Sequence, residues 1–301
     1  MSFNKKIAIC IPTYNRPSEL KRLIDSIPEP YSVFVSNNGE RLNGEKYGKR
    51  SKIYNHEVVL PIFENWNFPT QYVITDYILI PSDDDIYYEG AFDIIEKAIR
   101  ENPSVDVFVW GCNFVDGEYN IIGSKPIINE SRVLKNEAAF NMHKYSVSVR
   151  MPSFCIKKSL FDALGGFSTE MTLTASDSCL IQKALLSGDV YFGKEIISGY
   201  RVWSNSLTSQ RNATKQWFEE LDIWISEILS FAKLHDCEKI IPPDYREKIM
   251  YQNIRSAIST MKKNARSRKE QLYFLMDSAK NGYSKNILHI LKLIAVILFK
   301  K

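Results

Sequence analysis

Three consecutive carboxylates, Asp83, Asp84 and Asp85, follow an apolar segment at residues 77–80, from which Pro81 and Ser82 separate them. Adjacent carboxylates repel one another, so they cost stability unless a cation or hydrogen bonds offset the repulsion. Carboxylate oxygens are hard ligands that suit Mg²⁺ or Mn²⁺. The triplet therefore indicates a divalent cation site. The alternative is a solvated acidic turn that caps the next helix.

A second group of polar residues follows the first apolar segment of the chain. It consists of Pro12, Thr13, Tyr14, Asn15 and Arg16. Aromatic and amide groups suit a nucleobase, and a guanidinium near a helix N-terminus suits a diphosphate. This segment therefore indicates a nucleotide-binding loop. The alternative is a polar turn that only caps the helix opened by Pro17.

A further carboxylate, Asp177, lies where helical spacing begins and continues through Leu180, Ala184 and Leu185. It is the third feature of the sequence that could carry chemistry. The alternative is that Ser176 or Asp177 is simply the N-cap of that helix.

Strands and helices alternate over the first 110 residues. These elements must position the aspartate triplet and the polar segment at residues 12–16. Helical spacing predicts helices from Pro17, at 62–72 and at 90–101. Apolar runs predict strands at residues 7–11, 33–35, 56–60, 77–80 and 105–110. This order predicts an α/β fold with a doubly wound, mainly parallel sheet. Ligands of such sheets bind beyond the C-terminal strand ends, where the first two polar groups fall.

The later part of the chain changes in character. Residues 111–210 predict short strands near 112–122, 153–157 and 196–202, with helices near 159–164 and 176–187. From about residue 212 the pattern is mainly helical. We therefore expect a domain over residues 1–210 and a C-terminal helical extension over residues 211–301.

Composition restricts the class of protein. The 301 residues are 45% hydrophobic and 25% charged, as in globular proteins, and the net charge of +4 is too small to indicate a nucleic-acid partner. The five cysteines are far apart and lack the spacing of a zinc or redox site, which predicts free thiols in a reducing compartment. The apolar run at 7–11 is too short for a secretory signal, so we expect a cytoplasmic protein.

Taken in order, several segments resemble the family 2 glycosyltransferases, which have the A-type glycosyltransferase fold. The resemblance covers about residues 5–210. The matching segments are Ile7-Ala8-Ile9-Cys10-Ile11-Pro12-Thr13-Tyr14-Asn15-Arg16, Val35-Ser36-Asn37-Asn38-Gly39, Phe63-Glu64-Asn65-Trp66-Asn67, Leu79-Ile80-Pro81-Ser82-Asp83-Asp84-Asp85, Leu164-Gly165-Gly166-Phe167, Ala175-Ser176-Asp177 and Tyr200-Arg201-Val202-Trp203-Ser204-Asn205-Ser206-Leu207-Thr208.

The resemblance implies a role for each group. Asp85, with Asp83, would hold a Mn²⁺ or Mg²⁺ cofactor, and Asp177 would be the general base on the acceptor hydroxyl. A nucleotide-sugar donor would be bound by Pro12, Thr13, Tyr14, Asn15, Arg16, Asn37, Asn38, Asn65, Asp83 and Asp84. Two residues depart from the family pattern. Asn37 replaces an acid that commonly contacts the base, and Trp203 replaces a frequent histidine.

We therefore expect a metal-dependent inverting glycosyltransferase, with its nucleotide-sugar-binding and catalytic domain at residues 1–210. Its acceptor would be a glycan or a lipid-linked molecule of bacterial surface polysaccharide synthesis. One alternative is a sugar nucleotidyltransferase, but residues 12–17 lack the expected Gly-rich loop and lysine. Another is a catalytically inactive nucleotide- or carbohydrate-binding relative, which Asn37 and Trp203 would suit.

The C-terminal region combines basic residues with an apolar tail. The tail, residues 287–299, is interrupted only by His289 and Lys292 and is shorter than the roughly 20 residues of a spanning helix. A basic cluster precedes it, at Lys262, Lys263, Arg266, Arg268 and Lys269. We expect residues 285–301 to make peripheral contact with the inner face of the cell membrane. The alternative is a helix buried on the protein or on a second subunit of a homo-oligomer.

Overall fold

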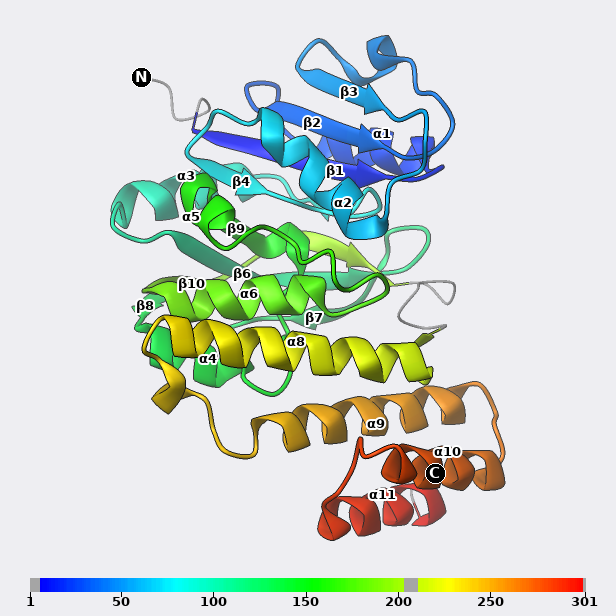
Figure 1. Ribbon diagram of the computed structural model, residues 1–301. Coiled ribbons are helices and arrows are strands. Elements are labelled where there is room, and N and C mark those ends of the chain that lie inside the picture. The colour runs from blue at the N-terminus through cyan, green and yellow to red at the C-terminus, as the bar shows by residue number, and fades with distance from the viewer. Residues whose placement is uncertain (1–5, 203–210, 300–301) are drawn as a thin grey trace.

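The structure, a computed structural model, describes residues 6–202 and 211–299. A ten-stranded sheet has the order β3-β2-β1-β4-β9-β6-β10-β5, with β7 on β6 and β8 on β10 (Figure 1). Its strands are β1 (Ile7–Thr13), β2 (Ser32–Asn37), β3 (Ser51–Asn55), β4 (Tyr77–Leu79), β5 (Ile86–Tyr87), β6 (Val107–Val115), β7 (Ile121–Lys125), β8 (Arg132–Leu134), β9 (Phe154–Lys157) and β10 (Val190–Arg201).

Helices lie on both faces of this sheet, and the C-terminal helices form further layers below it in the view of Figure 1. They are α1 (Pro17–Ser26), α2 (Ile62–Asn67), α3 (Ala91–Glu101), α4 (Asn136–His143), α5 (Lys158–Ala163), α6 (Ser176–Ser187), α8 (Lys215–Leu234), α9 (Tyr245–Lys263), α10 (Arg268–Lys280) and α11 (Ile287–Phe299). Short 3₁₀ turns occur at Gly44–Tyr47, Phe68–Tyr72, Met151–Ser153 and Glu238–Ile240.

The first four strands of the order pair in parallel, β3 with β2, β2 with β1 and β1 with β4. Strand β9 then lies antiparallel between β4 and β6, while β6 and β10 are again parallel. The expected α/β fold with helices on both faces is confirmed. The antiparallel strands all belong to the second half of the sheet or to its edges.

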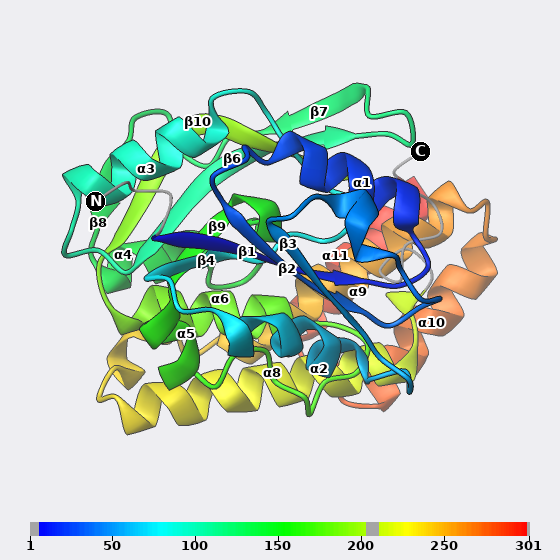
Figure 2. The ribbon, with the colours of Figure 1, turned by 90° about the horizontal axis from the view of Figure 1, so that it is seen from above.

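Strand β1 shows why the continuous apolar run was informative, because every one of its residues is buried. Ile7, Ile9 and Ile11 pack into a core with α1 and α3. Ala8 and Cys10 point to the other face, into a core that includes α2, α5 and α6. Figure 2 shows α1 and α3 on one side of the strands and α2, α5 and α6 on the other.

Four strand predictions need correction. The strand expected at 56–60 is wrong: β3 occupies Ser51–Asn55, and its pairing with β2 ends at Asn55. Val58 and Val59, which suggested a strand, are 76% and 61% exposed. The separate strands expected at 105–110 and 112–122 are one long strand, β6, followed by a turn and β7. Strand β10 begins at Val190 rather than near 196.

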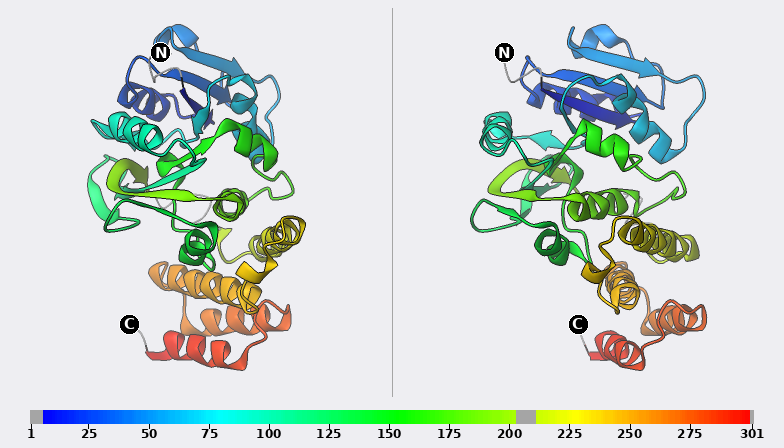
Figure 3. Two further views of the ribbon diagram at one scale, coloured as in Figure 1. Left: turned by 90° about the vertical axis from the view of Figure 1, so that its left-hand side faces the viewer. Right: turned by 60° about the vertical axis from the view of Figure 1, so that its left-hand side comes forward.

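The C-terminal helices form layers that continue from the sheet. Helix α8 packs on α6, α9 packs on α8, and α10 and α11 form the outermost pair (Figure 3). One hydrophobic core extends without a break from Ala8 in β1 to Leu293 and Ile297 in α11. The helical region therefore shares its core with the sheet domain.

Gln182 joins four of these helices through hydrogen bonds and is fully buried. Its Oε1 accepts from Trp224 Nε1 in α8, at 2.9 Å, and from the Tyr245 hydroxyl in α9. Its Nε2 donates to the carbonyls of His143 and Lys144 at the end of α4, at 2.9 and 3.1 Å. The Gln182 amide thus gives hydrogen-bond partners to buried polar groups that apolar packing alone would leave unpaired.

We expect Gln182→Leu to lower the free energy of unfolding by about 2–4 kcal/mol, because it leaves buried donors and acceptors unpaired. Ser187→Ala, at an exposed position on the same helix, is the matched control and should change stability little. Urea unfolding of both variants measures the difference. Equal midpoints would contradict a structural role for the Gln182 amide.

Candidate active site

The polar groups gather at one edge of the parallel half of the sheet. Strand β1 lies between β2 and β4 and runs parallel to both. The segments that follow these strands, beginning at Tyr14, Asn38 and Ile80, therefore lie side by side (Figure 1). The sequence placed the candidate residues at this edge, and the topology brings them there.

Asp83 and Asp84 are held by residues from the loop after β1. The Thr13 hydroxyl donates to Asp83 at 2.7 Å, and the Tyr14 N–H donates to the same oxygen at 3.4 Å. Arg16 Nη1 donates to Asp83 at 3.0 Å and to Asp84 at 2.9 Å. Burial raises the pKa of Asp83 to about 6, although Arg16 and Thr13 favour its charged form. Both Asp83 oxygens thus already have protein partners.

Asp85 differs from Asp83 in having one buried oxygen without a hydrogen-bond partner among the described residues. The side chain is 1% exposed, and its Oδ2 accepts from the Ser82 N–H at 2.8 Å. Its Oδ1 is buried and has no hydrogen-bond partner within the described residues. Burial raises the pKa of Asp85 well above its ordinary value and the charges of Asp84 and Asp83 raise it further, although the backbone N–H groups of Ser82 and Arg201 act in the opposite direction. A cation at Oδ1 would offset this repulsion.

The asparagines after β2 form a network of their own. Asn37 Nδ2 donates to the Glu40 carbonyl at 2.8 Å and to Asn55 Oδ1 at 2.7 Å. Asn38 exchanges two hydrogen bonds of 2.9 Å with the backbone of Leu60. Asn65 Oδ1 accepts from the Ser36 hydroxyl at 2.6 Å. All three are buried, so they shape the loops beside the site.

The loop after β1 leaves one aromatic ring available. Pro12 and Thr13 are buried, whereas Tyr14 is 56% exposed. Asn15 has a left-handed backbone, with φ of 54°, and its Oδ1 accepts from the Glu40 N–H at 2.8 Å. Gly39 must be glycine here, because a Cβ would lie 2.6 Å from the Asn15 nitrogen. The ring of Tyr14 is therefore the aromatic group of this loop that is open to a ligand.

Asp177 lies near the start of α6, on a different element from the triplet. The helix begins at Ser176, and the residue at its N-cap is Ala175, whose side chain makes no capping bond. Ser176 instead donates to the Ser168 carbonyl at 2.9 Å. Asp177 Oδ1 accepts from the adjacent Ser178 N–H at 2.7 Å and is partly exposed. The N-cap alternative for Ser176 or Asp177 is therefore not what the structure shows.

Tyr200 and Arg150, which were not singled out individually from the sequence, lie within the electrostatic influence of the site. Burial raises the pKa of Tyr200 to about 12, and the charges of Arg150, Asp85, Asp177 and Asp84 all act on it. The Arg150 guanidinium lies 5.2 Å from the centre of the Tyr200 ring. Its Nε is buried without a hydrogen-bond partner in the part of the chain described. No spacing in the sequence connects positions 150 and 200.

One expected site residue, Trp203, lies outside the described residues, as do positions 204–208 of the same segment. The preceding Arg201 pairs with Glu19 of α1 at 3.1 Å and donates to the Gly117 carbonyl at 3.2 Å. The end of β10 is thereby tied to α1 and to the turn between β6 and β7.

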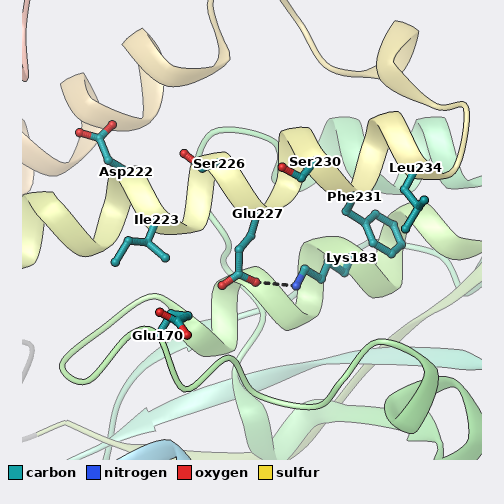
Figure 4. A pocket seen from close by; sticks show the side chains of 9 residues that line it. All are labelled: Glu170, Lys183, Asp222, Ile223, Ser226, Glu227, Ser230, Phe231 and Leu234. Atoms are coloured by element: carbon teal, nitrogen blue, oxygen red, sulfur yellow. Dashed lines mark hydrogen bonds and ion pairs between the residues drawn. The ribbon is translucent and has the colours of Figure 1, made fainter.

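A cavity of about 600 Å³ lies between α6 and α8, away from the aspartate triplet (Figure 4). Lys183 and Glu227 line it and pair at 2.6 Å. Neither Asp177 nor any of Asp83, Asp84 and Asp85 is among its lining residues. The cavity is therefore not the site where the candidate residues meet.

No family model matches the chain. An uncharacterized glycosyltransferase of Haemophilus influenzae is 25% identical over 175 residues, which is 55% of this chain and 57% of that protein. The chain thus spans somewhat more than half the length of this curated relative.

Some solved structures are similar to nearly the whole chain in fold, although their sequence identity to it is low. The crystal structure of S. aureus TarS 1–349 superposes with a TM-score of 0.61 at 13% identity, covering 97% of this chain and 90% of that one. Its complex with UDP-GlcNAc gives a TM-score of 0.62 at 14% identity with the same coverage. This likeness shows that the chain has the A-type glycosyltransferase fold implied by its sequence motifs, with the helical C-terminal part included.

Proposed function

We propose that the protein is a glycosyltransferase that moves a sugar from a nucleotide-sugar donor to an acceptor hydroxyl. The observation that carries this proposal is the gathering of buried aspartates, Arg16 and an exposed Tyr14 at one sheet edge, with Asp177 presented from α6. The glycosyltransferase similar over part of the chain supports the same activity. So do the TarS structures with UDP-GlcNAc and with UDP, which favour a uridine diphosphate sugar as the donor.

Each group of residues at this edge of the sheet would bind a different part of the donor. Tyr14 would stack on the base, and residues 12–16 would surround the ribose and diphosphate. Arg16 lies at the start of α1, where helix N–H groups and the guanidinium both favour a phosphate. Asn37, Asn38 and Asn65 would act mainly by holding this loop in place, because their amides are already hydrogen-bonded.

A Mn²⁺ or Mg²⁺ ion fits Asp85 better than it fits Asp83. Asp85 Oδ1 has no partner among the described residues, whereas both Asp83 oxygens are engaged by Thr13 and Arg16. No group of three His, Cys, Asp or Glu side chains within residues 6–202 and 211–299 is arranged to hold a metal. This suits an ion bound through one or two carboxylates together with donor phosphates. When bound, the ion would supply charge stabilisation to the diphosphate leaving group.

Asp177 is the group that we assign as the general base. It would accept the proton of the acceptor hydroxyl as that oxygen attacks the anomeric carbon, and a single displacement of this kind inverts the configuration. Its partial exposure leaves room for an acceptor. General-base catalysis of this type is worth about 10²–10⁴-fold in rate.

An inactive binding relative and a sugar nucleotidyltransferase remain the competing functions. Buried carboxylates with raised pKa values are expensive to keep, and they are typical of working sites. A thermal-shift screen with UDP-, GDP- and dTDP-sugars, with and without Mn²⁺, identifies the donor because ligand binding stabilises the folded state. An assay of sugar transfer then separates the three functions. A glycosyltransferase transfers the sugar, an inactive relative only binds the donor, and a nucleotidyltransferase synthesises the nucleotide sugar.

The acceptor we propose is a glycan or lipid-linked molecule of surface polysaccharide synthesis, met at the cytoplasmic face of the membrane. Among the described helices, none is both long and apolar enough to cross a bilayer. Helix α11 instead buries Leu293 and Ile297 against the other helices and exposes Leu288, Leu291 and Phe299. One face is thus packed on the protein, and the opposite apolar face is available to a lipid surface.

Charge around α11 supports the same contact. Between residues 262 and 292 the chain has eight Lys and Arg residues but only two acidic ones, Glu270 and Asp277. Basic residues beside an exposed apolar face favour anionic headgroups, by about 1 kcal/mol for each residue near the surface. Because Leu293 and Ile297 belong to the core, removal of the tail would also damage packing. Point substitutions on the exposed face are the better test.

We expect EDTA to abolish transfer and Mn²⁺ or Mg²⁺ to restore it. Asp85→Asn should stay folded, lose transfer and lose the Mn²⁺-dependent rise in melting temperature measured with UDP. Glu89→Gln, which changes an exposed carboxylate nearby, is the matched control. Full transfer in EDTA, or by folded Asp85→Asn, would remove the metal from the mechanism.

Asp177→Asn should lower the transfer rate by roughly 10²-fold or more, because the amide cannot accept the proton. The dissociation constant for UDP should stay near that of the unchanged protein, since Asp177 lies outside the nucleotide loop. Steady-state kinetics and UDP titration measure the two effects separately. Transfer at the original rate would place the base elsewhere.

The protein should bind vesicles containing phosphatidylglycerol, and binding should weaken as salt rises because screening reduces the attraction. Leu288→Glu with Leu291→Glu should abolish co-sedimentation while transfer to a soluble acceptor continues. Ile74→Glu, at a 98% exposed position elsewhere, is the control and should not affect binding. Vesicle binding that survives the α11 substitutions would assign the contact to another surface.

A further inference from the structure

The loop before α6 is held by two carboxylates of α8, Glu220 and Glu227, seven residues apart in one helix. This loop covers residues 167–175 and leads directly to Asp177. Figure 4 shows Glu227 reaching from α8 toward α6 and pairing with Lys183. The catalytic side of the proposed site therefore depends on a helix of the C-terminal region.

Glu220 binds the loop through its backbone. Its Oε2 accepts from the N–H groups of Leu173 and Thr174 at 2.8 and 2.7 Å. Its Oε1 accepts from the N–H and the hydroxyl of Thr172, both at 3.0 Å. Three successive N–H groups thus converge on one carboxylate that is only 4% exposed. Burial would raise the pKa of Glu220, but these hydrogen bonds outweigh it and lower the pKa.

The other end of the loop is fixed as firmly. Glu227 accepts from the Ser168 hydroxyl, and the Ser168 carbonyl accepts from Ser176 at 2.9 Å. The Asn67 side chain accepts from the Phe167 N–H at 2.9 Å and donates to the Phe167 carbonyl at 2.8 Å. Little freedom is left between residue 167 and the start of α6.

The loop delivers the chain to α6 in a strained backbone conformation. Ala175 has φ of 66°, in the left-handed region that non-glycine residues rarely adopt. Such strain persists only where the surroundings determine the backbone strongly. The bonds from Glu220 to residues 172–174, immediately before Ala175, provide that determination. The direction of the first turn of α6, and with it Asp177, follows from this geometry.

We propose that Glu220 is a positioning residue for sugar transfer, acting through the 172–174 backbone to place Asp177. The inference rests on the proposed role of Asp177 as base. The N–H and O–H partners of Glu220 offset the cost of burying its carboxylate, so the group stabilises the loop and orients it at the same time. The Glu220 carboxylate fixes the backbone of residues 172–174, because one rigid acceptor orients several donors at once.

The test is Glu220→Gln, which keeps the shape but replaces one acceptor oxygen by a donor that faces N–H groups. Transfer turnover should fall by roughly 10- to 100-fold, as expected for a misplaced catalytic group. The dissociation constant for UDP should change less than about twofold, since the nucleotide loop lies on β1. Hydrogen exchange should accelerate at the amides of residues 172–174. Glu219→Gln, which alters the adjacent exposed carboxylate paired with Lys215 at 2.9 Å, is the matched control.

A double-mutant cycle separates positioning from general damage. If Glu220 acts through Asp177, Glu220→Gln should lower transfer little further in the Asp177→Asn background. A merely structural role predicts that the two losses multiply. Should Glu220→Gln fail to fold, Thr172→Val removes the hydroxyl donor to Glu220, and a smaller fall in turnover with unchanged UDP binding is expected.

Two outcomes overturn the proposal while leaving the proposed function intact. One is unchanged turnover in folded Glu220→Gln while Asp177→Asn is inactive. The other is a full multiplicative loss in the cycle. Turnover at the original rate in Asp177→Asn would instead reject Asp177 as the base, whatever Glu220→Gln does.

Discussion

One nitrogen of Arg16 donates to Asp83 and to Asp84, at 3.0 and 2.9 Å, and this contact lets consecutive buried carboxylates coexist. The two loops involved follow β1 and β4, which pair in parallel, so the contact also fixes the nucleotide loop against the aspartates. Because Asp83 and Asp84 are buried, loss of Arg16 would leave their charges without this partner. Asp85 Oδ1 has no hydrogen-bond partner among the described residues, and it is the oxygen that we propose to bind the cation.

The aspartate triplet and Asp177 form the two sides of the proposed site, and different parts of the fold hold them in place. The aspartates lie where a parallel sheet always presents its strand ends, so the sheet itself positions them. Asp177 lies on a loop and helix held from behind by α8, through Glu220 and Glu227. One core joins the sheet to α11. The C-terminal helices are therefore part of the framework that aligns the two sides.

The sequence predicted those elements whose signal is local. The buried run of β1, the helix opened by Pro17 and the bounds of α11 all follow from apolar spacing and proline position. The strand expected at 56–60 was wrong because Val58 and Val59 are apolar yet exposed, and β-branched residues alone do not specify burial. The role of Glu220 could not be predicted, since its partners lie 46 to 48 positions away and meet it only after α8 packs on α6.

Asn37 is one of the two departures from the family pattern that would suit an inactive binding protein. Its amide donates to Asn55 and to the Glu40 carbonyl, which a carboxylate at this position could not do. The departure from the family pattern is thus matched by a neighbour that uses the amide, and it need not signal lost activity. Base recognition would then depend more on the exposed ring of Tyr14. The buried carboxylates Asp83 and Asp85 have raised pKa values, and in our proposal a bound divalent cation offsets the repulsion that this burial entails.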